Sequence, residues 1–199
     1  MAIPLTRRIR EVWANEGLAA VAARGARRVR RFLFTREEYV VFAADLIKTR
    51  DAIPTEAEVE WLLVDSPEAA GSLRRERLAA GGIACCAWSG DTLLHVSWAA
   101  RRSPAGIDPL ERYVDLSRCA YIGDCWTAPE ARGLGLYPEA LRRLLELLAD
   151  EGQHRTVLTV EKSNEASLRG VAKASFCQVG VGARVSVLGR SWWKGSAIG

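Results

Sequence analysis

One segment, residues 119–149, constrains the fold of this chain more than any other. A run of residues that favour β structure, 119–127, leads into a short loop with two glycines, Gly133 and Gly135. Leucines then recur at helical spacing. The segment therefore predicts a β-strand, a tight loop and an amphipathic helix in immediate succession.

The loop has the features of an anion-binding site. Glycines let the backbone turn tightly and leave its N–H groups uncovered. The first N–H groups of the following helix, at its positive dipole end, point to the same place. Arg132 adds a cation, and Pro138 suits the first helical turn, where its missing N–H costs nothing. We therefore expect this corner to bind a phosphate or diphosphate group.

Spacing excludes two other phosphate-binding loops. A P-loop requires Gly-x-x-x-x-Gly-Lys-Ser/Thr, which the chain lacks. The dinucleotide fingerprint Gly-x-Gly-x-x-Gly fails because Pro138 occupies the place of the third glycine. The loop is thus a different kind of anion site from either.

The composition is that of a single globular domain: 199 residues, of which 49% are hydrophobic and 26% charged. No run approaches the roughly 18 apolar residues of a membrane helix. We expect a cytoplasmic protein, because the N-terminal sequence lacks the pattern of a secretory signal and the five cysteines include no Cys-x-x-Cys pair. The two histidines, His95 and His154, are far apart, so no metal-ligand spacing is present and no metal is expected.

Hydrophobic periodicity indicates a mixture of strands and helices. The turn at residues 89–91 lies between two β-rich runs and predicts a hairpin. Strands are expected at residues 39–44, 59–64, 83–88, 92–98, 119–127, 156–160 and 179–188, an extended segment at 113–116, and helices at 67–80, 136–148 and 164–174. This order is typical of a mixed α/β (α+β) domain.

Charge divides the chain unevenly. Residues 1–31 contain eight Arg and two Glu, a charge of +6, whereas the whole chain carries +4, so the remainder sums to −2. We expect a basic helical extension at 1–34, a domain at 35–190 and a C-terminal tail at 191–199. The basic arm is either a solvated helix face or a surface for an acidic partner or an anionic membrane, with no specific nucleic acid expected.

The chain resembles the acetyl-CoA-binding core of the GNAT superfamily of N-acetyltransferases. The family pattern is a strand, then Gln/Arg-x-x-Gly-x-Gly/Ala opening a helix, and later a strand, an Asn and Lys-x-Gly-Phe. Residues 119–188 carry the match, through Arg132-Gly133-Leu134-Gly135-Leu136-Tyr137, Asn164, Ser167, Lys173 and Phe176. The resemblance implies a mainly antiparallel central sheet flanked by helices. It also implies acetyl-CoA as co-substrate and acetylation of an amine on a small molecule or amino sugar.

The resemblance implies cofactor contacts along the strand, the loop and the later helix. They fall on Cys125, Trp126, Thr127, Arg132, Gly133, Leu134, Gly135, Leu136, Tyr137, Asn164 and Ser167. Three residues depart from the family pattern: Tyr137 replaces Gly or Ala, Ser175 replaces Gly, and Val171 stands where a Tyr often protonates the leaving thiolate. Because valine cannot donate a proton, the candidates that remain to protonate the thiolate are solvent and the Tyr121 hydroxyl.

Direct attack of an amine on a thioester, the mechanism that the resemblance implies, requires a group that accepts the amine's proton. Asp124, beside the expected acetyl position, and Glu161, at the end of the next strand, are the candidates, and each also has a purely structural interpretation. Regular alternation puts Tyr121 and Cys125 on one face of the strand and Asp124 on the other. A β-bulge here would separate the neighbouring strands and admit the pantetheine arm.

Two alternative functions are compatible with the sequence. The same fold could transfer a longer acyl chain from acyl carrier protein, because carrier proteins are acidic and the N-terminal arm is basic. Alternatively, the chain could be a non-catalytic module that binds a partner through that arm. Binding of acetyl-CoA separates these readings, and the oligomeric state is left open.

Overall fold

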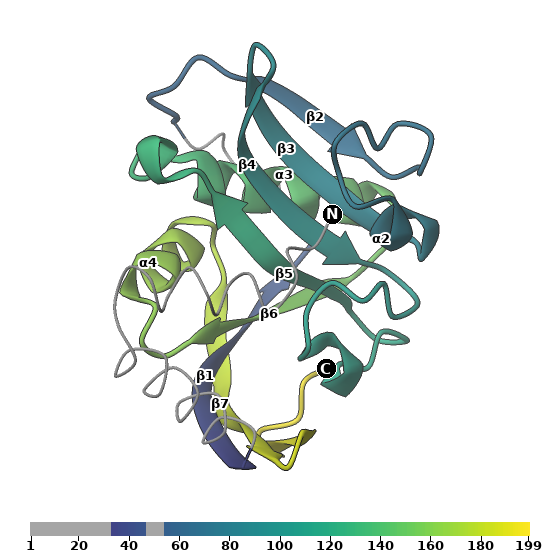
Figure 1. Ribbon diagram of the computed structural model, residues 1–199, viewed down its shortest axis with the longest axis vertical. Coiled ribbons are helices and arrows are strands. Elements are labelled where there is room, and N and C mark those ends of the chain that lie inside the picture. Colours follow the sequence, from purple (N-terminus) through teal and green to yellow (C-terminus); the bar gives the residue numbers. More distant parts are fainter. Residues whose placement is uncertain (1–32, 47–53) are drawn as a thin grey trace, which may run out of the picture. The chain divides into compact units, whose positions relative to one another are not determined.

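The computed structural model describes residues 33–46 and 54–199, so residues 1–32 of the expected helical extension, with its basic surface, lie outside the described residues (Figure 1). Phe34, the last residue of that expected extension, already belongs to a strand. The elements are β1 (Phe34–Asp45), β2 (Glu60–Val64), α2 (Arg75–Ala79), β3 (Gly82–Ser89), β4 (Thr92–Ala100), η1 (Glu111–Tyr113), β5 (Ala120–Thr127), η2 (Pro129–Ala131), α3 (Leu136–Asp150), β6 (Arg155–Glu161), α4 (Glu165–Lys173), β7 (Cys177–Val187) and β8 (Arg190–Gly195). The fold is mixed α/β, as the sequence predicts. No described helix has the length and apolar character needed to cross a membrane.

The strands form one sheet in the order β2-β3-β4-β5-β6-β1-β7-β8. The pairs from β2 to β5 are antiparallel, as is the pair of β1 with β6. The strands β5 and β6 are parallel and pair only over residues 120–122 and 156–158. Beyond that point no pairing joins them, so β5 and β6 separate toward their C-terminal ends.

Helix α3 covers one face of this sheet, because its leucines repeat at the spacing that forms a single apolar stripe. Leu141, Leu144, Leu145 and Leu148 are all fully buried. They pack with alternate residues of the central strands, including Ile122 of β5, and with Phe176 after α4. Figure 1 shows α3 behind β3 and β4, with α4 beside β6.

The opposite face of the same strands carries α2 and the loop at residues 101–113. The Glu111 carboxylate holds this loop by accepting the N–H groups of Ala105 at 2.5 Å and Ile107 at 2.7 Å. Arg77 of α2 lies over the ring of Trp98 at 5.3 Å from its centroid. The two faces are therefore different: helical and apolar on one side, and loop-covered with charged groups on the other.

Most predicted elements are confirmed, with three differences. The helix predicted at 67–80 is wrong in its first half: only Arg75–Ala79 is helical, because Gly71 takes the left-handed φ of +52°. The segment at 113–116 contributes one isolated bridge, Val114 with Ile198, rather than a strand. Part of the segment expected as a tail forms the strand β8.

The chain divides into two compact units, which we describe separately. The larger contains residues 38–182 and 195–199, and in the smaller the described residues are 33–37 and 183–194. Within the smaller unit, the Arg184 guanidinium pairs with the Glu37 carboxylate. All of the residues discussed below as a site belong to the larger unit.

Candidate functional site

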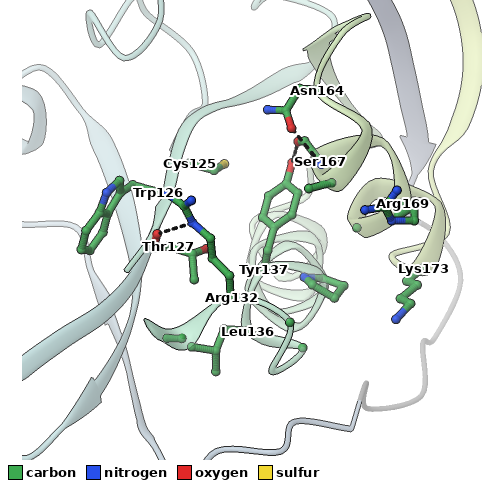
Figure 2. A pocket seen from close by; sticks show the side chains of 16 residues that line it. Cys125, Trp126, Thr127, Arg132, Leu136, Tyr137, Asn164, Ser167, Arg169 and Lys173 are labelled. Atoms are coloured by element: carbon green, nitrogen blue, oxygen red, sulfur yellow. Dashed lines mark hydrogen bonds between the residues drawn. The ribbon is translucent and has the colours of Figure 1, made fainter. Parts of the chain in front are cut away.

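A cavity of about 700 Å³ opens between the C-terminal end of β5, the start of α3 and one side of α4 (Figure 2). Ten of the eleven residues predicted to contact a cofactor line it, the exception being Leu134. The lining residues are Cys125, Trp126, Thr127, Ala131, Arg132, Gly133, Gly135, Leu136, Tyr137, Pro138, Asn164, Ala166, Ser167, Arg169, Gly170 and Lys173. The structure thus brings together two segments that are about thirty residues apart in the sequence.

The loop before α3 presents unused backbone donors to this cavity. Gly133 and Gly135 take the left-handed φ values of +90° and +80°, which explains why glycine occupies both positions. Within residues 33–46 and 54–199, the N–H groups of Gly133, Leu134 and Gly135 donate to no acceptor. The loop is instead held from behind, where Glu56 donates its N–H to the Leu134 carbonyl at 3.0 Å. A rigid loop with free N–H groups at a helix N-terminus is an anion site.

Three cationic side chains line the same cavity: Arg132 from the loop, and Arg169 and Lys173 from α4. The Nε of Arg132 donates to the Thr127 carbonyl at 3.4 Å, which keeps that side chain along the end of β5. Sequence reasoning missed Arg169. Its four-residue spacing from Lys173, on a helix that begins at the predicted cap Asn164, was the available signal. The cavity therefore suits a ligand with several negative charges.

The cap of α4 is the one the sequence predicts. The Asn164 side-chain oxygen accepts the N–H of Ser167 at 3.1 Å. The Ser167 hydroxyl in turn donates to the Tyr137 hydroxyl at 3.3 Å. The Tyr137 ring lies against Gly170, where an added Cβ would come within 2.5 Å of the ring, so the two residues fit only as a pair. Helices α3 and α4 are thereby joined at the cavity wall.

A buried histidine supports the wall at the end of β5. His95 is fully buried, with Nδ1 2.7 Å from the Thr127 hydroxyl and Nε2 2.8 Å from the Ser97 hydroxyl. Burial lowers the pKa of His95 to about 3, so the ring is neutral. Burial also raises the pKa of Cys125 to about 12, which keeps this thiol protonated and unsuited to act as a nucleophile.

A β-bulge interrupts β5. The register of β4 with β5 shifts between Val96 and Trp98, so Asp124 and Cys125 together lie opposite Ser97. Asp124 takes a φ of +49°, which turns the chain. The expected alternation along β5 is therefore wrong after residue 123.

The bulge sends neighbouring side chains to opposite faces. Cys125 packs on the α3 side with Ile122. Asp124 lies on the α2 side, where its Oδ2 forms an ion pair with the buried guanidinium of Arg77 and lies 3.8 Å from Arg74. Both of these contacts use Oδ2, and the Asp124 side chain is 43% exposed.

The other two candidate catalytic residues occupy different positions. Tyr121 is fully buried, and its hydroxyl lies 3.0 Å from the Thr159 hydroxyl where β5 and β6 begin to separate. Burial raises the pKa of Tyr121 well above its usual value, so it stays protonated. Glu161 is exposed at the end of β6 and accepts the Ser163 hydroxyl at 2.9 Å. None of the three candidates lines the cavity itself.

Comparison with known proteins identifies the fold. Residues 105–176 match the sequence model of the acetyltransferase (GNAT) family. The fold is similar to a GNAT-family acetyltransferase from Colwellia psychrerythraea, with a TM-score of 0.51, 13% identity, and coverage of 76% of this chain and 55% of that one. This is the GNAT fold. A GCN5-related N-acetyltransferase-like protein from Streptococcus suis gives a TM-score of 0.51 at 12% identity, covering 86% of this chain and 68% of that one.

The chain spans just over half of the Colwellia protein, and no curated protein sequence matches it. Among the described residues, no group of three or more His, Cys, Asp or Glu side chains could hold a metal ion.

The structure explains two departures from the GNAT pattern. Ser175, in the place of a glycine, takes the left-handed φ of +61°, the conformation that glycine adopts at no steric cost. Val171, in the place of the frequent tyrosine, is fully buried in the core and does not line the cavity. Val171 therefore contributes no group to the cavity, whereas Tyr137 of α3 lines it and carries a hydroxyl.

Proposed function

We propose that the protein is an acetyl-CoA-dependent N-acetyltransferase that acts on a small amine by direct attack in a ternary complex. One observation carries the proposal: the backbone N–H groups of Gly133 and Gly135, which have no acceptor among the described residues, precede α3 in a cavity that three cationic side chains also line. Coenzyme A carries a diphosphate and a further phosphate, which fit this combination of donors. Five free cysteines are consistent with a cytoplasmic location.

Within this proposal, the loop residues Gly133–Gly135 bind the diphosphate, and Arg132, Arg169 and Lys173 neutralise the phosphate charges. Bound acetyl-CoA supplies an activated acyl group as a thioester. The ends of β5 and β6 are separated, so Cys125, Trp126 and Thr127 can line the pantetheine arm. The β-bulge leaves backbone groups outside the ladder, available as donors to a developing oxyanion.

The proton transfers fall to groups at or near the bulge. In this proposal the Asp124 carboxylate accepts a hydrogen bond from an incoming ammonium and, directly or through water, its proton. Glu161 is the second candidate base, at the far side of the gap between β5 and β6. The neutral hydroxyls of Tyr121 and Tyr137 are the candidate donors to the departing sulfur.

Thermal-shift titration tests the proposal. Acetyl-CoA at 100 times its Kd would stabilise the protein by about 2.7 kcal/mol, and Arg132→Glu should abolish the shift by placing a carboxylate beside the phosphates. Arg75→Glu is the matched control, because Arg75 is exposed on α2 and does not line the cavity. Absence of any response to CoA thioesters in the wild type would remove the proposal.

The same titration separates the alternatives. A stronger response to acyl carrier protein than to acetyl-CoA would indicate the longer-chain acyltransferase. Salt-sensitive binding of anionic lipid, with no response to CoA, would indicate the non-catalytic module.

A further inference from the structure

Parts of three neighbouring strands, β1, β7 and β8, supply most of the described residues of the smaller unit. Figure 1 shows β1 beside β7. The Leu188 N–H donates to the Leu33 carbonyl at 3.4 Å, and the ion pair of Arg184 with Glu37 joins the same two strands further along. Because one number rises as the other falls, β1 and β7 are antiparallel here.

Side-chain contacts divide these strands between two faces. The ion pair puts Arg184 and Glu37 on one face, and the Ser186 and Ser191 hydroxyls, 2.5 Å apart across the β7–β8 hairpin, lie on the same face. Since side chains alternate along a strand, the other face is made of the remaining residues. We call it the aromatic–cationic face, and its members are Phe34, Arg36, Val185, Val187, Arg190, Trp192 and Lys194.

The aromatic–cationic face is open to solvent. Phe34 on β1 is 55% exposed and Trp192 on β8 is 45% exposed, and the two valines of β7 between them are only partly buried. Its three cationic side chains are exposed as well. Large apolar side chains gathered on an exposed face are typical of an interaction surface.

The charge of this face has one sign. Among residues 33–37 and 183–194 the only carboxylate is that of Glu37, which lies on the opposite face with Arg184. Glu38, the next residue on this side of β1, belongs to the larger unit and pairs with Lys162 at 3.5 Å. The contrast extends through the sequence: residues 1–37 carry +6 and 183–194 carry +3, whereas the whole chain carries +4, so the rest sums to −5.

The turn of the hairpin adds an exposed apolar tip. Leu188 and Gly189 take the left-handed φ values of +49° and +78°, as a two-residue hairpin turn requires. Asn, Asp or Gly is usual at the first of these positions, and a leucine there is strained. Leu188 is 59% exposed, so burial does not offset this strain. The adjoining Leu33 is 50% exposed, and the two leucines extend the apolar surface around the tip.

We propose that the aromatic–cationic face and the hairpin tip bind the surface of an anionic lipid bilayer. The proposal does not depend on the acetyltransferase function. Arginine and lysine side chains attract anionic headgroups, and tryptophan prefers the level of the headgroups in a membrane. Phe34 and Leu188 enter the boundary with the acyl chains, where their apolar surface leaves water. The basic sequence 1–31, which precedes this unit, adds electrostatic attraction.

Two other partners fit this surface less well. A nucleic acid would engage the cations and stack on the aromatic rings, but it offers no apolar phase to the exposed leucines and valines. A second copy of the chain in a two-fold dimer would bring the same three cations against their own counterparts. A bilayer with anionic headgroups matches both the apolar and the charged side chains.

The charge arm of the test uses the full chain and vesicles of phosphatidylcholine with about one-third phosphatidylserine. We expect binding that weakens as salt is added and is poor on phosphatidylcholine alone. Replacing both Arg190→Gln and Lys194→Gln should lower the partition coefficient by about thirtyfold. The matched control, Arg75→Gln with Arg118→Gln, removes the same charge from exposed positions of the larger unit and should change it less than about twofold. Equal losses would overturn the proposal.

The tip separates membrane binding from folding. Leu188→Asn places a residue that tolerates left-handed φ at the turn, so the urea midpoint should rise. The same variant removes apolar surface from the bilayer, so partitioning onto the vesicles should fall by about fivefold. Unchanged partitioning by Leu188→Asn would contradict insertion of the tip.

Quenching of fluorescence by brominated acyl chains locates the contact. The quenching that accompanies vesicle binding should be largely lost in Trp192→Phe and kept in Trp126→Phe, whose tryptophan is equally exposed, at 45%, on the larger unit. Quenching that persists in Trp192→Phe would overturn the proposal. So would tighter binding of an oligonucleotide than of the vesicles, or a concentration-dependent dimer in sedimentation that Trp192→Phe dissociates.

Discussion

At the scale of single residues, the wall of the cavity depends on a histidine that water does not reach. His95 holds the hydroxyls of Thr127 and Ser97, and both of its ring nitrogens are thereby occupied. In the neutral ring one nitrogen donates and the other accepts, and the two hydroxyls can match either role. Because the ring is fully buried, a charged imidazolium there would lack the solvation that water provides. Protonation of His95 therefore opposes the folded state.

The first prediction concerns pH and stability. An unfolded chain protonates its histidines below about pH 6.5, whereas burial lowers the pKa of folded His95 to about 3. The unfolded state thus binds more protons between these values, and the free energy of unfolding falls as pH falls through this window. From pH 6.5 to 4.5, His95 should remove about 2 kcal/mol, measured by urea denaturation.

Two variants isolate this effect. His95→Gln should lose about 2 kcal/mol less than the wild type over the same pH range, whatever its stability at pH 7. His154→Gln should behave as the wild type, because His154 is exposed. Identical pH profiles for the wild type and His95→Gln would contradict a buried neutral histidine.

Single residues also mark the limit of sequence reasoning. Arg132, Gly133 and Gly135 could be placed in a site because local spacing alone defines a loop at a helix start. His95 could not, because its partners Ser97 and Thr127 are brought to it by pairing of β4 with β5. Nor could the burial of Arg77 be placed from the sequence, because its contact with Trp98 depends on tertiary packing.

At the scale of elements, the bulge in β5 and the short helix α2 stabilise each other. Asp124 would be a strained strand residue at its φ of +49° without a partner for its carboxylate, and α2 has only five residues. The ion pair of Arg77 with Asp124 ties one to the other, over the ring of Trp98. The geometry at the bulge therefore depends on α2.

The second prediction compares the two arginines that face Asp124. Arg77→Met keeps an apolar stem over Trp98 but removes a buried charge partner, and should lower the free energy of unfolding by about 2 kcal/mol. Arg74→Met should cost less than about 0.5 kcal/mol, because Arg74 is 60% exposed and 3.8 Å from the carboxylate. Urea denaturation at pH 7 measures both, and equal losses would show that Arg77 does not anchor the bulge.

Helices and strands could be predicted where nearby residues in the sequence determine them. The helix at 136–148 and the hairpin of β3 with β4 follow from periodicity and turn residues. The alternation along β5 failed at Asp124 because a bulge is imposed by the neighbouring strand, whose register no local pattern records. The start of α2 failed because the turns at 65–74 carry helix-favouring residues around Gly71.

At the scale of the whole molecule, the cavity lies within one compact unit, whereas two of the strands have residues in both units. Every described residue that lines the cavity belongs to the larger unit, and the described residues of the smaller unit, 33–37 and 183–194, contribute none. The strands β1 and β7 each run from one unit into the other. Because these strands belong to both units, the two units unfold either in one cooperative step or separately.

The last prediction uses hydrogen exchange to test whether the two units unfold together. Acetyl-CoA at 100 times its Kd should raise the opening free energy of the larger unit by about 2.7 kcal/mol, slowing exchange there by about a hundredfold. The strongest protection should fall on residues 133–137 and 164–167, because these contact the ligand directly. Residues 183–194 should keep their rates, since local opening of the smaller unit leaves the cavity intact. Equal slowing at 183–194 would show that both units unfold as one, whereas unchanged rates at 133–137 would contradict binding at the N-terminus of α3.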